Sequence, residues 1–128
     1  MADAETILRE YGLAPHPEGG WYREFHRSGR SFEGLPGYPG PRAAVTAIWF
    51  CLRREEFSAF HRLRSEEAWI HLSGGPLELV LLGSGKAERR RIASVEEGGP
   101  PGTVVSAGVF QAARPLGDYC FAACLVAP

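Results

Sequence analysis

The sequence lacks the features that mark secreted, zinc-binding and membrane proteins. It has three cysteines, Cys51, Cys120 and Cys124, and no C-x-x-C pair, so neither a disulfide framework nor a zinc site is indicated. It has no run of about 18 consecutive apolar residues, and residues 1–10 contain no apolar stretch of signal-peptide length. We therefore expect a cytoplasmic protein with no membrane partner.

An excess of charge is also absent. The chain has 14 basic and 15 acidic side chains, a formal net charge of −1, so electrostatics give no reason to expect nucleic acid as a partner. The basic cluster at residues 89–91 falls on a predicted strand, where it is typical of a solvated face. A small-molecule ligand is the partner that this composition leaves open.

The length and the turn-forming residues favour one β-rich domain over residues 1–128. A chain of 128 residues can bury a core without metals or disulfides. Its 16 glycines and 10 prolines indicate many tight turns between short elements. We therefore expect a single domain built from short strands.

The N-terminal third predicts one helix, one strand and a long loop. Asp3 can cap a short helix that ends at Gly12 and covers an open end or edge of the β structure. Residues 21–26 alternate between two faces, as in a strand. Residues 28–42 are rich in glycine and proline and predict a long loop, a type of segment that often acts as a lid.

The rest of the chain repeats short apolar stretches separated by turn signals. The predicted strands are residues 43–52, 57–63, 67–72, 77–82, 86–93, 103–106, 109–113 and 119–126. Many short strands at regular spacing predict a sandwich or a barrel, an all-β fold, and not a parallel α/β sheet.

Polar side chains gather on two neighbouring predicted strands. Residues two apart on a strand face the same way, so His61 and Leu63 project together. The same holds for Glu67, Trp69 and His71. An imidazole and a carboxylate on adjacent strands form either half of a metal site or an acid–base pair, and the spacing does not choose between them.

The segment from His61 to Gly74 resembles the first motif of the cupin superfamily. The pattern His61-x-Leu63-x3-Glu67-x6-Gly74 matches H-x-H-x(3,4)-E-x6-G, except that Leu63 replaces the second histidine. The resemblance implies a double-stranded β-helix, or jelly-roll barrel, with a pocket at one open end. In this chain a short N-terminal helix would precede it.

A second segment resembles the second cupin motif. Ser106-x-Gly108-x2-Gln111 is similar to P-x-G-x2-H, with Gln111 in the place of the histidine. Two of the four usual metal ligands, His61 and Glu67, are therefore kept. With Gln111 they would hold a divalent transition metal only weakly, because a neutral amide is a poor ligand.

A closer resemblance, to the cupin-5 family, covers nearly the whole chain. It rests on residues 16–24, 46–50, 58–69, 74–79 and 109–112. Glu66 stands where that family typically has aspartate, and the Gly-Phe and acidic tail that usually follows is absent after Pro128. The resemblance implies a homodimer, in which a partner covers exposed strands.

The two cupin motifs also imply roles for individual side chains. His61 is the candidate general base, and Glu67 orients it or binds metal. The further candidate ligand-binding residues are Glu18, Arg23, Ser58, Trp69, His71 and Gln111. A remote similarity to cupin sugar-nucleotide epimerases, which also lack a metal cage, implies that Arg23 and Glu24 stand near a sugar or sugar-nucleotide ligand.

Three functions stay open on this evidence. The first is an isomerase-like or epimerase-like enzyme acting on a sugar or sugar nucleotide. The second is a metal-dependent cupin enzyme that uses His61, Glu67 and Gln111. The third is a non-catalytic barrel that binds or senses a small molecule.

Overall fold

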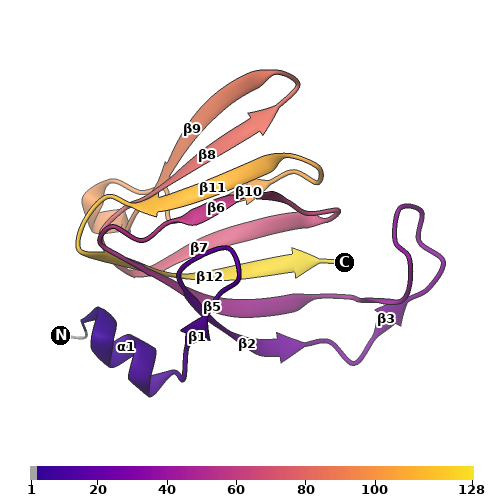
Figure 1. Ribbon diagram of the computed structural model, residues 1–128, viewed down its shortest axis with the longest axis horizontal. Helices are drawn as coiled ribbons and strands as arrows, with labels where there is room; N and C mark the ends of the chain where they lie inside the picture. Colours follow the sequence, from indigo (N-terminus) through magenta and orange to yellow (C-terminus); the bar gives the residue numbers. More distant parts are fainter. Residues whose placement is uncertain (1–2) are drawn as a thin grey trace.

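Turns rich in glycine and proline divide the chain into short strands, which pair into two large antiparallel sheets and one two-stranded sheet in the computed structural model (Figure 1). The structure describes residues 3–128. The six-stranded sheet contains, in spatial order, β1 (Ala14–Pro15), β2 (Trp21–Arg27), β5 (Thr46–Arg53), β12 (Tyr119–Ala127), β7 (Glu66–Gly74) and β10 (Gly102–Val105). The four-stranded sheet contains β6 (Ser58–Arg62), β11 (Phe110–Pro115), β8 (Leu77–Gly83) and β9 (Lys86–Ile92).

The core lies between these two sheets. Alternate residues of each strand face inward, so β5, β7 and β8 bury Leu52, Trp69 and Leu79 in one apolar cluster. The predicted all-β jelly-roll fold with a short N-terminal helix is confirmed.

The N-terminal helix α1 (Ala4–Glu10) begins where the sequence predicts. The Asp3 carboxylate accepts a hydrogen bond of 2.8 Å from the backbone N–H of Thr6, which satisfies one free donor of the first turn. Ile7 packs with Cys51 of β5 and Phe121 of β12. The helix therefore covers part of the outer face of the six-stranded sheet, over β5 and β12, and the prediction that it covers an open end or edge is wrong (Figure 1).

The predicted long loop contains a small hairpin and is tied to the barrel. Its strands β3 (Ser31–Phe32) and β4 (Arg42–Ala43) pair with each other. The Tyr38 hydroxyl donates a hydrogen bond of 2.8 Å to the carbonyl oxygen of Arg64, in the turn between β6 and β7. The remaining short element is the 3-10 helix η1 (Val95–Glu97).

The sequence predicts neither disulfide bonds nor a membrane-spanning segment, and the structure can be compared with both expectations. Cys51, Cys120 and Cys124 are all buried and free of disulfides. Within residues 3–128 no helix is long and apolar enough to cross a membrane. The cytoplasmic location stays a prediction.

Gly74, the last residue of β7, gives a first test of the fold. Its φ is +85°, and a Cβ atom there would lie 2.5 Å from the carbonyl oxygen of Tyr119. We expect Gly74→Val to lower the free energy of unfolding by at least about 3 kcal/mol, measured by urea denaturation. Gly85→Val is the matched control, since Gly85 has φ +75° but open space around it. Equal losses in both variants would contradict the collision with Tyr119.

The homodimer stays a prediction, and the six-stranded sheet offers a surface for it. Ile70, Leu72, Val104 and Leu125 are exposed on neighbouring strands of this sheet. An apolar sheet face of this kind is unfavourable in water, and a second copy of the chain would cover it. We expect light scattering at micromolar concentration to give twice 14.0 kDa, and Ile70→Glu to halve that mass. A monomeric wild type would contradict the prediction.

Candidate functional site

A small cavity of about 20 Å³ lies between the two sheets. It is lined by His16, Ile48, Phe50, Ser58, His61, Glu67, Trp69 and Cys124. One water molecule needs about 10–15 Å³ of such volume, so the cavity admits a single oxygen-sized group.

Strand alternation and one bulge direct these side chains inward. Glu67 and Trp69 are two apart on β7 and face the core together, as predicted. Ser58 and His61 are three apart on β6, which in a regular strand would place them on opposite faces. The pairing of β6 with β11 shifts register between Gln111 and Ala113, and this bulge lets both Ser58 and His61 line the cavity.

The His61 ring is held in one tautomer. Its Nδ1–H donates a hydrogen bond of 2.8 Å to the carbonyl oxygen of Ala59. In the neutral ring the other nitrogen, Nε2, therefore carries a lone pair and can accept a proton. This arrangement suits the predicted role of His61 as a general base.

Glu67 is buried with one carboxyl oxygen unsatisfied. Only 6% of the residue is exposed, and no described group forms a hydrogen bond with its Oε1 atom. Burial raises the pKa of Glu67 to about 7, although the nearby His61, Gln111 and Trp69 side chains act in the opposite direction. Near neutral pH this carboxyl group can therefore either donate or accept a proton.

Gln111 and Trp69 hold each other beside this carboxyl group. The Trp69 indole N–H donates a hydrogen bond of 3.0 Å to the Gln111 Oε1 atom, and Gln111 is 1% exposed. With its oxygen engaged, Gln111 has its N–H groups left as donors toward Glu67. We therefore assign it a positioning role.

His16 completes the cavity, and the sequence analysis did not single it out. Its Nδ1 accepts a hydrogen bond of 2.9 Å from the backbone N–H of Glu18, so the neutral ring carries its proton on Nε2. Burial, then the nearby His61, lower the pKa of His16, while Glu18 acts in the opposite direction. The one sequence signal was its place at the head of the resemblance over residues 16–24. His16 therefore supplies a neutral donor to the cavity that His61, with its acceptor nitrogen, also lines.

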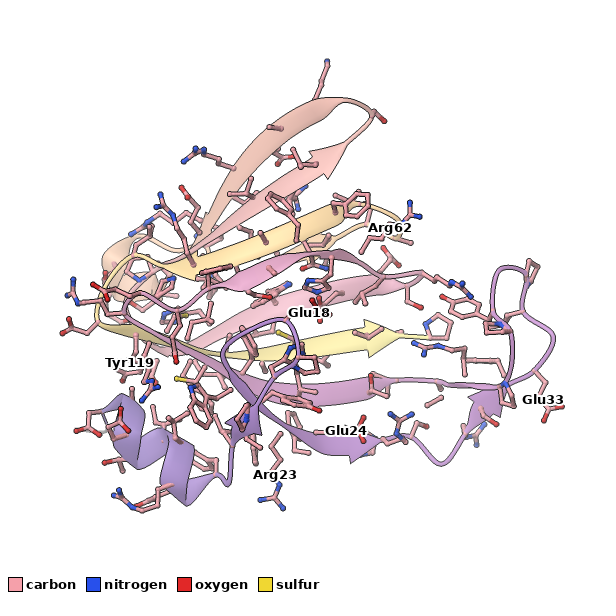
Figure 2. The ribbon with its side chains drawn as sticks, viewed as in Figure 1. Glu18, Arg23, Glu24, Glu33, Arg62 and Tyr119 are labelled. Atoms are coloured by element: carbon pink, nitrogen blue, oxygen red, sulfur yellow. The ribbon has the colours of Figure 1, made fainter. Side chains whose placement is uncertain are left out.

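Four of the six predicted ligand-binding residues do not line the cavity, namely Gln111, described above, and Arg23, His71 and Glu18. Arg23 is exposed, donates to the carbonyl oxygen of Tyr11 at 3.3 Å, and points away from the space between the sheets (Figure 2). The buried His71 donates from Nε2 to the carbonyl oxygen of Gly75 at 2.9 Å, which fastens the turn between β7 and β8. Glu18 is half-buried and contributes its backbone to hold the His16 ring.

The donor atoms fit a tightly bound metal poorly. His61 Nε2 and Glu67 Oε1 are available, but the Gln111 oxygen accepts from Trp69 and the His16 Nε2 carries a proton. Within residues 3–128 no three His, Cys, Asp or Glu side chains are grouped to hold an ion. Two ligands fall short of the three that catalytic metals usually take from a protein.

Comparison with known proteins identifies related chains. The profile of a family described as "Cupin superfamily (DUF985)", Cupin_5, matches residues 5–128. A hypothetical protein from Leishmania major is 29% identical, with a TM-score of 0.86 over 99% of this chain and 82% of that one. A protein from Shewanella oneidensis is 28% identical, with a TM-score of 0.88 over 100% of this chain and 79% of that one. None of the curated proteins matches this chain.

More distant structures share the fold alone. A cupin 2 conserved barrel domain protein from Salinispora arenicola is 16% identical, with a TM-score of 0.63 over 94% of this chain and 85% of that one. An oxalate decarboxylase from Lactobacillus farciminis, solved with formate, is 18% identical, with a TM-score of 0.63 over 90% of this chain and 30% of that one. Such likeness confirms the barrel but carries no activity to this chain.

Weak binding of a divalent transition metal stays a prediction. With two free ligands, we expect purified protein to contain well under one equivalent of metal, and added Mn²⁺ or Zn²⁺ to be removed by a brief wash with chelator. Elemental analysis before and after the wash measures this. One tightly held transition metal per chain would contradict it.

Glu67→Gln tests the buried carboxyl group. The pKa of Glu67 is raised from 4.5 to about 7 in the folded protein, so the native state keeps a proton that the unfolded chain releases. The contribution of Glu67 to the free energy of unfolding should therefore be greatest below pH 4.5 and fall by about 3 kcal/mol as the pH rises from about 4.5 through 7. Glutamine cannot ionise and removes this fall.

The measurement is urea denaturation of wild type and variant at about pH 4.5 and about pH 8. Glu33→Gln, a change at an exposed glutamate (Figure 2), is the control and should follow wild type. If the Glu67→Gln and wild-type curves run parallel across this range, the carboxyl group is not desolvated as described.

Proposed function

Because the chain belongs to the Cupin_5 family of the cupin superfamily, we propose that its barrel binds a small polar molecule and moves a proton on it. In this proposal the protein is an isomerase-like or epimerase-like enzyme, and its ligand is of the sugar or sugar-nucleotide type. The observation that carries the proposal is that Glu67, with its buried and unsatisfied Oε1, lines the same small cavity as His61, whose Nε2 is an acceptor.

The proposed chemistry follows from the protonation states of the three cavity groups. His61 Nε2 takes a proton from the carbon next to a carbonyl group. Protonated Glu67 gives a proton to the carbonyl oxygen, which yields a neutral enol, and His16 donates a hydrogen bond to the same oxygen. In an isomerisation, the protonated His61 then gives its proton to the former carbonyl carbon, while the ionised Glu67 takes a proton from the hydroxyl group on the neighbouring carbon. In an epimerisation, Glu67 takes back the enol proton, a water molecule protonates the other face of the carbon, and His61 gives its proton to the hydroxide that is left.

The cavity size agrees with this proposal. A space of about 20 Å³ accepts one oxygen atom of a ligand and leaves the rest of the molecule outside. Ile48, Phe50 and Cys124 form apolar walls around it. Burial raises the pKa of the Cys124 thiol far above its ordinary value, so the thiol stays neutral and is no candidate nucleophile.

Binding is tested by thermal shift against sugars, sugar nucleotides and keto acids, because a bound ligand raises the melting temperature. For each ligand found, we expect His61→Ala to melt within about 5 °C of wild type. The same variant should lose binding or turnover by about 100-fold. His26→Ala, a change at an exposed histidine of β2, is the matched control and should bind normally. A His61→Ala protein that melts far below wild type would place His61 in the core.

Catalysis and plain recognition are separated by hydrogen exchange. A ligand incubated with the protein in heavy water should gain deuterium on carbon, as seen by NMR, and Glu67→Gln should slow this gain. Binding without exchange would favour the non-catalytic sensor. Exchange that requires added metal would favour the metal-dependent enzyme.

A further inference from the structure

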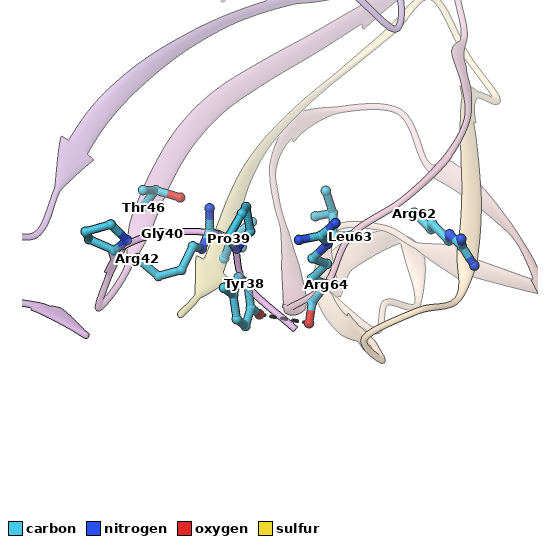
Figure 3. A pocket seen from close by; sticks show the side chains of 10 residues that line it. Tyr38, Pro39, Gly40, Arg42, Thr46, Arg62, Leu63 and Arg64 are labelled. Atoms are coloured by element: carbon cyan, nitrogen blue, oxygen red, sulfur yellow. Dashed lines mark hydrogen bonds between the residues drawn. The ribbon is translucent and has the colours of Figure 1, made fainter. Parts of the chain in front are cut away.

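A second, larger pocket of about 550 Å³ opens at the end of the barrel near β3 and β4 (Figure 3). It is lined by Tyr38, Pro39, Gly40, Pro41, Arg42, Thr46, Arg62, Leu63, Arg64 and Val126. We call it the mouth pocket. Its volume lies within the range of about 300–1,000 Å³ that is typical of sites for small molecules.

The mouth pocket continues the inner cavity along the barrel. Thr46 of β5 lines the mouth, and Ile48, two residues on, lines the cavity. Val126 and Cys124 of β12 are related in the same way. Residues two apart share a face and lie about 7 Å apart along a strand, so one small ligand can occupy both spaces.

The charge of the mouth pocket is positive. Arg42, Arg62 and Arg64 line it, and no acidic residue does. Over residues 3–128, the ion pairs found involve other arginines and none of these three. In a chain with a net charge of −1, Arg62 and Arg64 thus place two cations without an acidic partner at the mouth pocket.

Contacts with the protein keep the arginines in place. Arg64 donates to the carbonyl oxygen of Gly37 at 2.7 Å, and the Arg62 guanidinium stacks over the Phe110 ring at 5.1 Å. Arg42 donates from Nε and Nη2 to the backbone oxygen of the last residue, Pro128, at 3.1 and 2.8 Å. Arginines held in this way are arranged in advance to receive an oxyanion.

We infer that the mouth pocket binds the anionic group, a phosphate or a carboxylate, of the small ligand whose other end enters the inner cavity. This inference depends on the proposed function only for the end of the ligand that reacts in the inner cavity. It narrows the ligand class from polar molecules in general to small organic anions. Leu63 adds an apolar surface to the lining of the mouth pocket.

The test uses inorganic phosphate and pyruvate as probes, in calorimetric titrations at low ionic strength, with chloride at equal ionic strength as the reference. We expect Arg62→Gln to weaken binding of the preferred probe about tenfold. Within residues 3–128 the Arg62 side chain forms no hydrogen bond and only stacks over Phe110, so the variant should fold, as circular dichroism will show. Arg89→Gln, at an exposed arginine of β9, is the matched control and should bind like wild type.

A second measurement locates the anion. Phosphate should shift the backbone amide NMR signals of Thr46 and Leu63, which line the mouth, and leave those of β9 in place. Preference for phosphate identifies organic phosphates as the ligand class, and preference for pyruvate identifies carboxylates. No binding above chloride, or equal losses in Arg62→Gln and Arg89→Gln, would overturn the inference.

The result of this test can be distinguished from the result of the test of the proposed function. His61→Ala and Glu67→Gln should keep the affinity for inorganic phosphate, because neither side chain lines the mouth pocket. Arg62-dependent phosphate binding without any hydrogen exchange on carbon would leave the mouth site standing and refute only the chemistry. Hydrogen exchange on the carbon of neutral sugars that is unchanged in Arg62→Gln would support the proposed chemistry and refute the mouth site.

Discussion

The burial of the Glu67 carboxyl group is the constraint on which the candidate site depends. A carboxylate inside a barrel loses its hydration, and here one of its oxygens receives no hydrogen bond in return. The fold offsets part of this cost with the side chains of Trp69 and Gln111, which are bonded to each other. Near neutral pH this carboxyl group therefore populates both its protonated and its ionised state, whereas a solvated glutamate would be ionised.

The surrounding scaffold fixes the two histidines in complementary states. A backbone carbonyl oxygen accepts a hydrogen bond from the Nδ1–H of His61, and a backbone N–H donates a hydrogen bond to the Nδ1 of His16. One ring therefore presents an acceptor to the cavity and the other presents a donor, although the two side chains are chemically identical. The backbone, through the bulge in β6 and the turn before β2, sets this difference.

The sequence predicts the parts of this site that depend on regular alternation. It places Glu67 and Trp69 on one face of a strand and brings His61 near them, because period-two spacing needs no long-range information. It places Arg23 near the ligand by remote similarity, but alternation cannot say which face of β2 is inward. It does not assign His16 to the site, because this residue lies in a turn 45 positions before His61 and meets it only through the barrel closure.

In the two proposals above, the mouth pocket binds the anionic group of the ligand and the inner cavity transfers its proton, two roles that a bound metal could otherwise fill. In the motif that this chain resembles, a second histidine stands at the position of Leu63, and Gln111 also replaces a histidine. These two replacements remove nitrogen ligands from the interior, and Leu63 turns to line the mouth pocket. Positive charge is then supplied from outside the cavity, by Arg42, Arg62 and Arg64, where guanidinium groups stay partly hydrated and need no burial. An anionic ligand could thus be oriented by the mouth while the neutral interior handles only its proton.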